Sequence, residues 1–179
     1  IPLVDTEKYY TFECLSSEAH KTERFIRDNG KVINGHSAEG SLFRFEAADD
    51  DNGYYIKSYV TDKYINHTTD GSNKVYASGE KNTIWTMEVP SHTLAARTLT
   101  VGKNLYLNNN GSDCTDNSCT NLQSLDHTKQ GGAPGSGNAC SLWTITEGTP
   151  LDKSALNTLI GETNTLIESC YTDEEFDYA

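Results

Sequence analysis

Short apolar runs, separated by turn-forming residues, follow one another along most of the chain. Between residues 53 and 89, four such runs occupy positions 54–59, 63–66, 74–77 and 84–89. The runs are rich in β-branched and aromatic residues, and Gly, Asn, Asp and Ser fill the gaps between them. This pattern predicts four strands joined by tight turns.

The same four-run unit occurs once before and once after this segment. The last run of each unit opens with a small hydroxyl residue, an aliphatic residue and a large aromatic residue, as in Ser41-Leu42-Phe43, Thr83-Ile84-Trp85 and Ser141-Leu142-Trp143. The spacing from Phe43 to Trp85 equals that from Tyr64 to Tyr106, and the third unit is longer because its turns carry extra residues. Three repeats, at about 8–52, 53–93 and 94–148, therefore predict twelve strands.

One unit is too small to bury its own apolar side chains, so the three units are expected to share a core. Twelve short strands in three four-strand repeats predict an all-β protein with a β-trefoil architecture, arranged about a pseudo-threefold axis. Phe43, Trp85 and Trp143 then belong to the structural core. The third strands of the repeats are predicted at 31–34, 74–77 and 121–124. An ordinary β-sandwich with accidental similarity between the units is the alternative.

The pattern changes after residue 148. Apolar residues then recur at spacings of three and four, which is the period of an amphipathic α-helix. The residues on this face are Leu156, Leu159, Ile160, Thr163, Leu166, Ile167 and Cys170. Asp152 or Ser154 is expected to cap the helix. The predicted organisation is a β domain over 1–148, followed by a helix and an acidic tail over 149–179.

Composition narrows the class of partner. The 179-residue chain carries a net charge of −12, which argues against binding to nucleic acid or to an anionic membrane surface. No apolar run is long enough for a membrane span. The first residues, Ile-Pro-Leu without Met, favour a trimmed or mature form of the protein.

Five cysteines bear on the cellular compartment. Cys114 and Cys119 bracket a predicted hairpin turn, where a local disulfide would fit a secreted or cell-surface protein; a pair of thiols is the alternative. Cys14, Cys140 and Cys170 leave one odd thiol, and their pairing stays open. A zinc site needs a second pair of ligands that the sequence does not offer. No metal and no cofactor are predicted.

The second repeat contains Lys63-Tyr64-Ile65-Asn66, Asp70-Gly71, Lys74-Val75 and Asn82-Thr83-Ile84-Trp85-Thr86-Met87. In these stretches it resembles a repeat of the ricin-type β-trefoil lectins, and the resemblance extends over residues 8–148. It implies a carbohydrate-binding module of a secreted multidomain protein, as found beside glycosidase or protease domains in bacterial glycan-degrading proteins.

The chain departs from the family pattern at the sugar site. Ser41, Thr83 and Ser141 stand where the family has the Gln of Gln-x-Trp, and the position of the family's stacking aromatic residue, after the third strand, falls near Ser78 and carries no ring. The family's sugar-binding Asp falls on Arg27, Asn66 and Asn108 in the three repeats. The candidate carbohydrate-binding residues are Asn66, His67, Asp70, Asn82 and Asn108. The alternative is that they are turn residues, which Asn and Asp favour for backbone reasons.

The sequence predicts a binder rather than an enzyme. Its carboxylates lie in turns, and it contains neither Gly-x-Ser-x-Gly nor His-Glu-x-x-His. We therefore expect a non-catalytic module that binds a glycan, and the family resemblance implies that it is part of a larger glycan-degrading enzyme. The alternative is a structural spacer or protein-interaction module that positions a neighbouring domain. A protease inhibitor is a third reading, although the loop at 126–138 is too rich in Gly to be preorganised.

Overall fold

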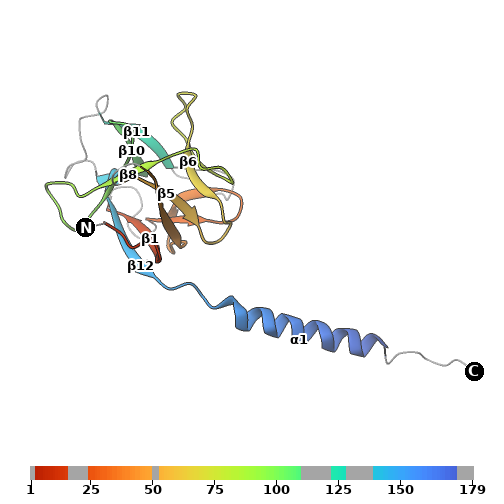
Figure 1. The fold of residues 1–179 in the computed structure, drawn as a ribbon. Helices are drawn as coiled ribbons and strands as arrows, with labels where there is room; N and C mark the ends of the chain where they lie inside the picture. Colours follow the sequence, from red (N-terminus) through yellow and green to blue (C-terminus); the bar gives the residue numbers. More distant parts are fainter. Residues whose placement is uncertain (1–2, 16–23, 50–52, 110–121, 128–138, 173–179) are drawn as a thin grey trace, which may run out of the picture. The chain divides into compact units, whose positions relative to one another are not determined.

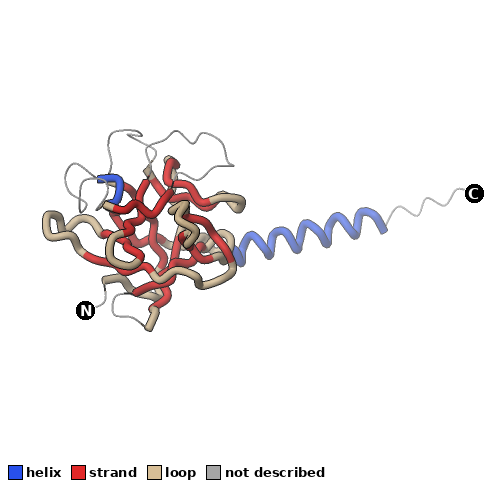
Figure 2. The backbone as a smooth tube through the Cα atoms, turned by 90° about the horizontal axis from the view of Figure 1, so that it is seen from above, coloured by secondary structure: helices blue, strands red, loops and turns tan. Residues whose placement is uncertain are grey.

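The computed structural model describes residues 3–15, 24–49, 53–109, 122–127 and 139–172. The chain divides into two compact units, Ile1–Thr149 and Pro150–Ala179. The strands belong to the first unit and the long helix to the second, as Figures 1 and 2 show. The prediction of an all-β protein with a C-terminal helix is confirmed at this level.

The described part of the first unit contains twelve strands, all in one antiparallel sheet, and one short 3-10 helix. The strands are β1 (Tyr9–Cys14), β2 (Phe25–Asp28), β3 (Ile33–Ser37), β4 (Phe43–Ala47), β5 (Gly53–Ser58), β6 (Tyr64–His67), β7 (Val75–Ser78), β8 (Trp85–Glu88), β9 (Thr98–Val101), β10 (Leu105–Asn109), β11 (Leu122–Asp126) and β12 (Trp143–Gly148). The 3-10 helix η1 is Ala139–Ser141.

Six of the strands pair in a closed ring. β1 pairs with β4, β4 with β5, β5 with β8 and β8 with β9, while β12 pairs with β1 along its whole length. Arg97, just before β9, closes the ring through two backbone hydrogen bonds to Trp143 in β12, at 2.8 and 2.9 Å. The first and last strands of the unit are therefore neighbours.

The other six strands form three hairpins, β2–β3, β6–β7 and β10–β11. Their second strands contact one another. The Asn109 side chain donates to the Gly35 carbonyl at 2.9 Å, and the Ser124 amide donates to the Asn73 carbonyl at 2.8 Å. A Cβ atom on Gly35 would lie 2.6 Å from Asn109 Oδ1, so this close approach requires glycine.

The core is one apolar cluster to which both the ring strands and the hairpins contribute side chains. Phe43, Trp85 and Trp143 have no exposed surface and belong to one apolar cluster. The indole N–H of Trp85 donates to the Ile65 carbonyl, and that of Trp143 donates to the Leu107 carbonyl, both at 2.9 Å. Each bond ties a ring strand to the first strand of its own hairpin.

The third strand of the first repeat begins later than the pattern predicts, at Ile33 rather than at residue 31. The side chain of Asn29 accepts hydrogen bonds from the amides of Lys31 and Val32, both at 2.9 Å. Gly30 has a φ of +88°. The turn therefore uses residues that an apolar-run pattern assigns to the strand, because Asn side chains compete for nearby backbone amides.

The second unit contains helix α1 (Lys153–Thr172). The carboxylate of Asp152 accepts the amide of Ser154 at 2.8 Å, which is the bond expected of an N-cap residue. Leu156, Leu159, Ile160, Leu166 and Ile167 are 49–65 % exposed. No helix in the described ranges combines the length and the apolar character required to cross a bilayer.

Part of the cysteine prediction lies outside the described residues. Cys114 and Cys119 fall in the range 110–121, so their disulfide and the secreted setting inferred from it stay predictions. Cys14 and Cys140 are not joined by a disulfide. The Gly-rich segment at 131–137 also lies outside the described residues.

Candidate functional site

Asn66, the first predicted sugar ligand, is fully buried in the protein. Its amide donates to Ser78 Oγ and to the Glu80 carbonyl, both at 2.9 Å, and its Oδ1 accepts the Asn82 amide at 3.0 Å. These bonds hold the segment after β7 against the end of β6. In this structure the Asn66 side chain stabilises a turn and presents no polar atom to solvent.

Asn108 occupies the corresponding place in the third repeat and is 3 % exposed. Its amide nitrogen donates to Ser141 Oγ at 2.8 Å, and its Oδ1 accepts the Gln123 side chain at 3.1 Å. Asn66 and Asn108 therefore lie in different hairpins and both bond within the protein.

The three remaining candidates lie around the β6–β7 hairpin. The amide of His67 donates to Thr83 Oγ1 at 2.9 Å, and partial burial lowers the pKa of its imidazole. Asp70 is exposed and accepts the Ser72 amide at 2.9 Å within the turn. Asn82 is also exposed, and its side chain donates to Tyr76 Oη at 3.4 Å. The structure thus joins Asn82 to Asn66, and leaves only Asp70 and Asn82 exposed.

A different group of side chains lies side by side on the outer face of the ring. Tyr9 in β1 is opposite Arg44 in β4, Arg44 is opposite Lys57 in β5, and Lys57 is opposite Tyr64 in β6. All four are partly exposed, because their strand neighbours point into the core. We call Tyr9, Arg44, Lys57 and Tyr64 the tyrosine–cation row.

A cavity of about 280 Å³ opens at one end of this row. Tyr9 and Tyr59 form an edge-to-face pair there, with ring centroids 5.2 Å apart. The lining residues are Tyr9, Arg44, Lys57, Ser58, Tyr59 and Asp62. The cavity therefore combines two aromatic rings, two cations, a hydroxyl and a carboxylate.

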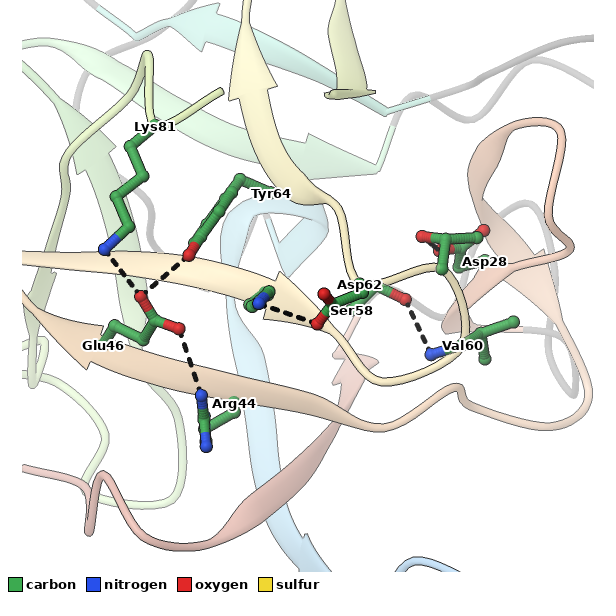
Figure 3. Close-up of polar contacts among 10 residues, drawn as sticks. Asp28, Arg44, Glu46, Ser58, Val60, Asp62, Tyr64 and Lys81 are labelled. Carbon is green, nitrogen blue, oxygen red and sulfur yellow. Dashed lines mark hydrogen bonds and ion pairs between the residues drawn. The ribbon is translucent and has the colours of Figure 1, made fainter. Parts of the chain in front are cut away.

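The turn after β5 brings Tyr59 and Asp62 to the cavity. Ser58 is buried, and its hydroxyl accepts the Val60 amide at 3.2 Å (Figure 3). Its carbonyl accepts the Asp62 amide at 3.1 Å, and Asp62 has a φ of +60°. Asp is one of the few side chains that tolerates this conformation. The turn is anchored further by Thr61, whose hydroxyl donates to Asp28 Oδ2 at 2.6 Å.

Glu46, two residues after Arg44, collects three donors beside the row. Figure 3 shows Arg44, Tyr64 and Lys81 converging on its carboxylate, at 3.2, 3.0 and 2.8 Å. Burial by itself would raise the pKa of Glu46, but the hydrogen bonds from Lys81, Tyr64 and Arg44 outweigh it and lower that pKa. Glu46 is therefore an ionised carboxylate that fixes the positions of its three partners.

Lys81 and Lys57 also contact the aromatic rings of tyrosines. Lys81 Nζ lies 5.1 Å from the Tyr55 ring centroid and 5.3 Å from that of Tyr64. Lys57 Nζ also lies 5.3 Å from the centroid of the Tyr64 ring. Contacts at these distances are favourable cation–π interactions.

Lys57 is bonded to a carboxylate that is much more exposed than itself. Its ammonium lies 2.7 Å from Asp62, and the side chains are 19 % and 84 % exposed. The hydrogen bond to Asp62 raises the pKa of Lys57. Three cations therefore form ion pairs with two carboxylates in this region of a chain whose net charge is −12.

A second hollow, of about 480 Å³, is lined by residues of the lead-in to β1 together with Tyr10 and Glu147. It has a single aromatic side chain, and that residue, Tyr10, is 8 % exposed. Within the described ranges, no group of three or more His, Cys, Asp or Glu side chains is placed to hold a metal ion. The cavity beside the row is therefore the better candidate site.

Sequence reasoning missed this cavity because its residues come from three strands of two different repeats. The only local signal is alternation: Arg44 stands between two buried phenylalanines, and Lys57 follows buried Ile56. Alternation shows that these side chains point outward, but it does not show which strands are neighbours.

Comparisons with known proteins add no assignment. No protein-family model matches the chain, and no curated protein matches it.

Proposed function

We propose that the first unit is a β-trefoil that serves as a non-catalytic carbohydrate-binding module. The ring of six strands and the three hairpins support the trefoil, because each repeat supplies two ring strands and one hairpin. In this arrangement the ring is the barrel and the hairpins are its cap.

Equivalent bonds in different repeats also support the trefoil. Ser41 and Thr83 each lie two residues before the last strand of their repeat, and the hydroxyl of each accepts a backbone amide from the end of the second strand, at 2.9 Å. Trp85 and Trp143 each donate to the carbonyl of an aliphatic residue in the second strand. Repeated contacts of this kind are expected when copies of one unit adopt the same fold.

The observation that carries the binding proposal is the cavity beside the tyrosine–cation row. The paired rings of Tyr9 and Tyr59 offer an apolar surface with a polar edge, and Arg44 and Lys57 add hydrogen-bond donors. A sugar presents an apolar C–H face and a rim of hydroxyls, so it matches both features. Sites of this type are concave with a few converging polar groups.

A binding role is also favoured over hydrolysis at this place. A glycosidase general acid needs a carboxyl whose pKa is raised. Glu46 has a lowered pKa and both of its oxygens accept hydrogen bonds, while the neighbouring Asp62 carboxylate is highly exposed. Glu46 is therefore poorly suited to hold a proton for a leaving group.

A glycan array probed with the full chain tests this function. We expect retention of at least one class of glycan, and we expect Tyr59→Ala to weaken that binding by about tenfold or more, because an aromatic contact surface is lost. Tyr59 is only partly buried, so the variant is expected to fold, which thermal unfolding checks.

Tyr76→Ala is the matched control for this experiment. Tyr76 is 36 % exposed on β7 and contacts Asn82, which belongs to the originally predicted site. Unchanged binding by Tyr76→Ala supports the cavity. Loss of binding in this variant alone would instead assign the glycan to the β6–β7 turn.

A protein-interaction or spacer module is the second candidate function. It is favoured by the apolar face of α1, where five large aliphatic side chains are about half exposed or more. Contiguous exposed apolar side chains are typical of interaction sites. If the full chain retains no glycan on the array, this second function becomes the better proposal.

A further inference from the structure

We propose that the cavity beside the tyrosine–cation row selects an acidic saccharide, with the carboxylate or sulfate of one sugar residue placed between Arg44 and Lys57. This inference rests on the proposed carbohydrate-binding function and names its ligand class. It is carried by the placement of the two cations, by the weakness of their present partners and by the size of the cavity.

The two cations lie next to each other on neighbouring strands. Arg44 and Lys57 are directly opposite in the β4–β5 register, where side chains approach to about 5 Å between Cβ atoms and like charges are unfavourable. Both point to the outer face, and their side chains are 38 % and 19 % exposed. The fold therefore concentrates positive charge at a position where an additional anion would relieve repulsion.

The carboxylates that pair with these two cations do not prevent a ligand anion from binding them as well. Asp62 is 84 % exposed, and ion pairs with exposed groups contribute little to stability. Arg44 shares the Glu46 carboxylate with Lys81 and Tyr64, and its bond to Glu46 uses one of the five N–H donors of the guanidinium. An arriving anion can therefore replace Asp62 at Lys57 and bind Arg44 through its fork of donors.

The walls of the cavity suit a sugar ring attached to that anion. Tyr9 and Tyr59 stand at the same cavity as the two cations. Its volume of about 280 Å³ is at the lower limit of small-molecule sites. This volume fits one sugar residue, so a single terminal or internal acidic residue is the expected unit of recognition.

The charge of the whole chain limits how acidic the ligand is. The net charge is −12, and Glu7 acts on Arg44 through its charge as well. At about 0.1 M salt, interactions between exposed charges are screened beyond about 10 Å. One anionic group can therefore bind at short range, whereas a densely charged polyanion is repelled. The geometry points to a uronic acid or a singly sulfated sugar.

Isothermal titration calorimetry of the full chain tests this proposal. The probes are a galactose oligosaccharide that ends in one galacturonic acid residue, the matched neutral galactose oligosaccharide, and the same oligosaccharide with a single 6-sulfate. We expect an acidic probe to bind at least about tenfold more tightly than its neutral counterpart, and we expect this preference to shrink as salt is raised. The carboxylate and sulfate probes distinguish the two sources of the anion.

Three variants sharpen the test. Lys57→Gln is expected to abolish the preference for the acidic probe, and Lys103→Gln, which removes an exposed lysine of the third repeat, is the matched control. Asp62→Asn is expected to increase the affinity for the acidic probe severalfold, because it removes the competing carboxylate. Asn also tolerates a positive φ, so the turn is preserved.

The outcomes separate this inference from the proposed function. Equal binding of neutral and acidic probes, unchanged by Lys57→Gln, overturns the acidic ligand and leaves carbohydrate binding intact. Weaker acidic binding by Asp62→Asn also overturns it, because Asp62 would then be a sugar ligand itself. Absence of binding to these probes and to every glycan of the array removes both proposals.

Discussion

Glu46 shows how one side chain organises a surface. It accepts bonds from Arg44, Tyr64 and Lys81, and it is largely buried with a side chain that is 21 % exposed. Its partners come from β4, β6 and the segment after β7, so one carboxylate connects three parts of the first unit. These bonds favour the ionised form and hold the pKa of Glu46 below its ordinary value of 4.5, despite the opposing effect of burial.

The lowered pKa of Glu46 predicts a pH-dependent contribution to stability. A carboxylate whose folded pKa is depressed stabilises the fold above its unfolded pKa, and this contribution is lost as pH falls through the folded pKa. We therefore expect Glu46→Gln to decrease the unfolding free energy by about 1–2 kcal/mol at neutral pH. The difference from the unsubstituted chain is expected to shrink progressively below pH 4.5, the ordinary pKa of the group. Urea unfolding at a series of pH values measures it.

Glu39→Gln is the control for this measurement, because Glu39 is an exposed glutamate. Its substitution is expected to change stability by less than about 0.5 kcal/mol. A loss in Glu46→Gln that is the same at neutral and acidic pH would contradict the assigned role of the carboxylate.

At the scale of the element, the indole bonds connect ring strands with hairpins. Trp85 belongs to β8 and reaches β6, whereas Trp143 belongs to β12 and reaches β10. In the first repeat Phe43 takes this place, and its ring has no N–H group to donate. Two of the three repeats thus use the same polar contact inside an otherwise apolar core.

Replacing either indole tests whether the two contacts are equivalent. Trp85→Phe and Trp143→Phe each remove a buried hydrogen bond and leave a carbonyl without that donor, so each is expected to decrease the unfolding free energy by about 1–3 kcal/mol. The two losses are expected to agree within about 1 kcal/mol, since both residues are fully buried and make bonds of the same length. Denaturant unfolding followed by circular dichroism measures both. A negligible loss in one variant would show that the two repeats are not energetically equivalent.

At the scale of the whole molecule, the first unit is closed by contacts between its ends. β1 and β12 pair over six positions, from Tyr9 opposite Gly148 to Cys14 opposite Trp143. The ring cannot be complete until the last strand has joined the first. The repeats therefore depend on one another and are not independent modules.

This closure predicts that the first unit unfolds in a single cooperative transition. Tryptophan fluorescence reports on the second and third repeats through Trp85 and Trp143, and near-ultraviolet circular dichroism reports on the packed tyrosines. We expect both signals to change at the same urea concentration. Different midpoints for the two signals would show that a repeat unfolds by itself.

The local sequence pattern was sufficient to predict the strands and the helix of the chain. Runs of β-branched and aromatic residues bounded by turn residues predicted the twelve strands, and the spacing of three and four after residue 148 predicted α1, because both patterns are properties of a single segment. The strand ends were less predictable where a side chain such as Asn29 captured backbone amides.

The candidate site was decided only by the tertiary structure. The sequence around Asn66 is the same whether its side chain binds a sugar or stabilises a turn. Only the fold shows that its side-chain amide is buried and bonded within the protein. Tyr9, Arg44 and Lys57 are far apart in the chain and share no motif, yet the β1–β4–β5 register makes them neighbours. The sequence by itself determined which segments are strands and which side chains point outward, since those properties are local. Which outward side chains meet was decided by long-range pairing, which no single segment encodes.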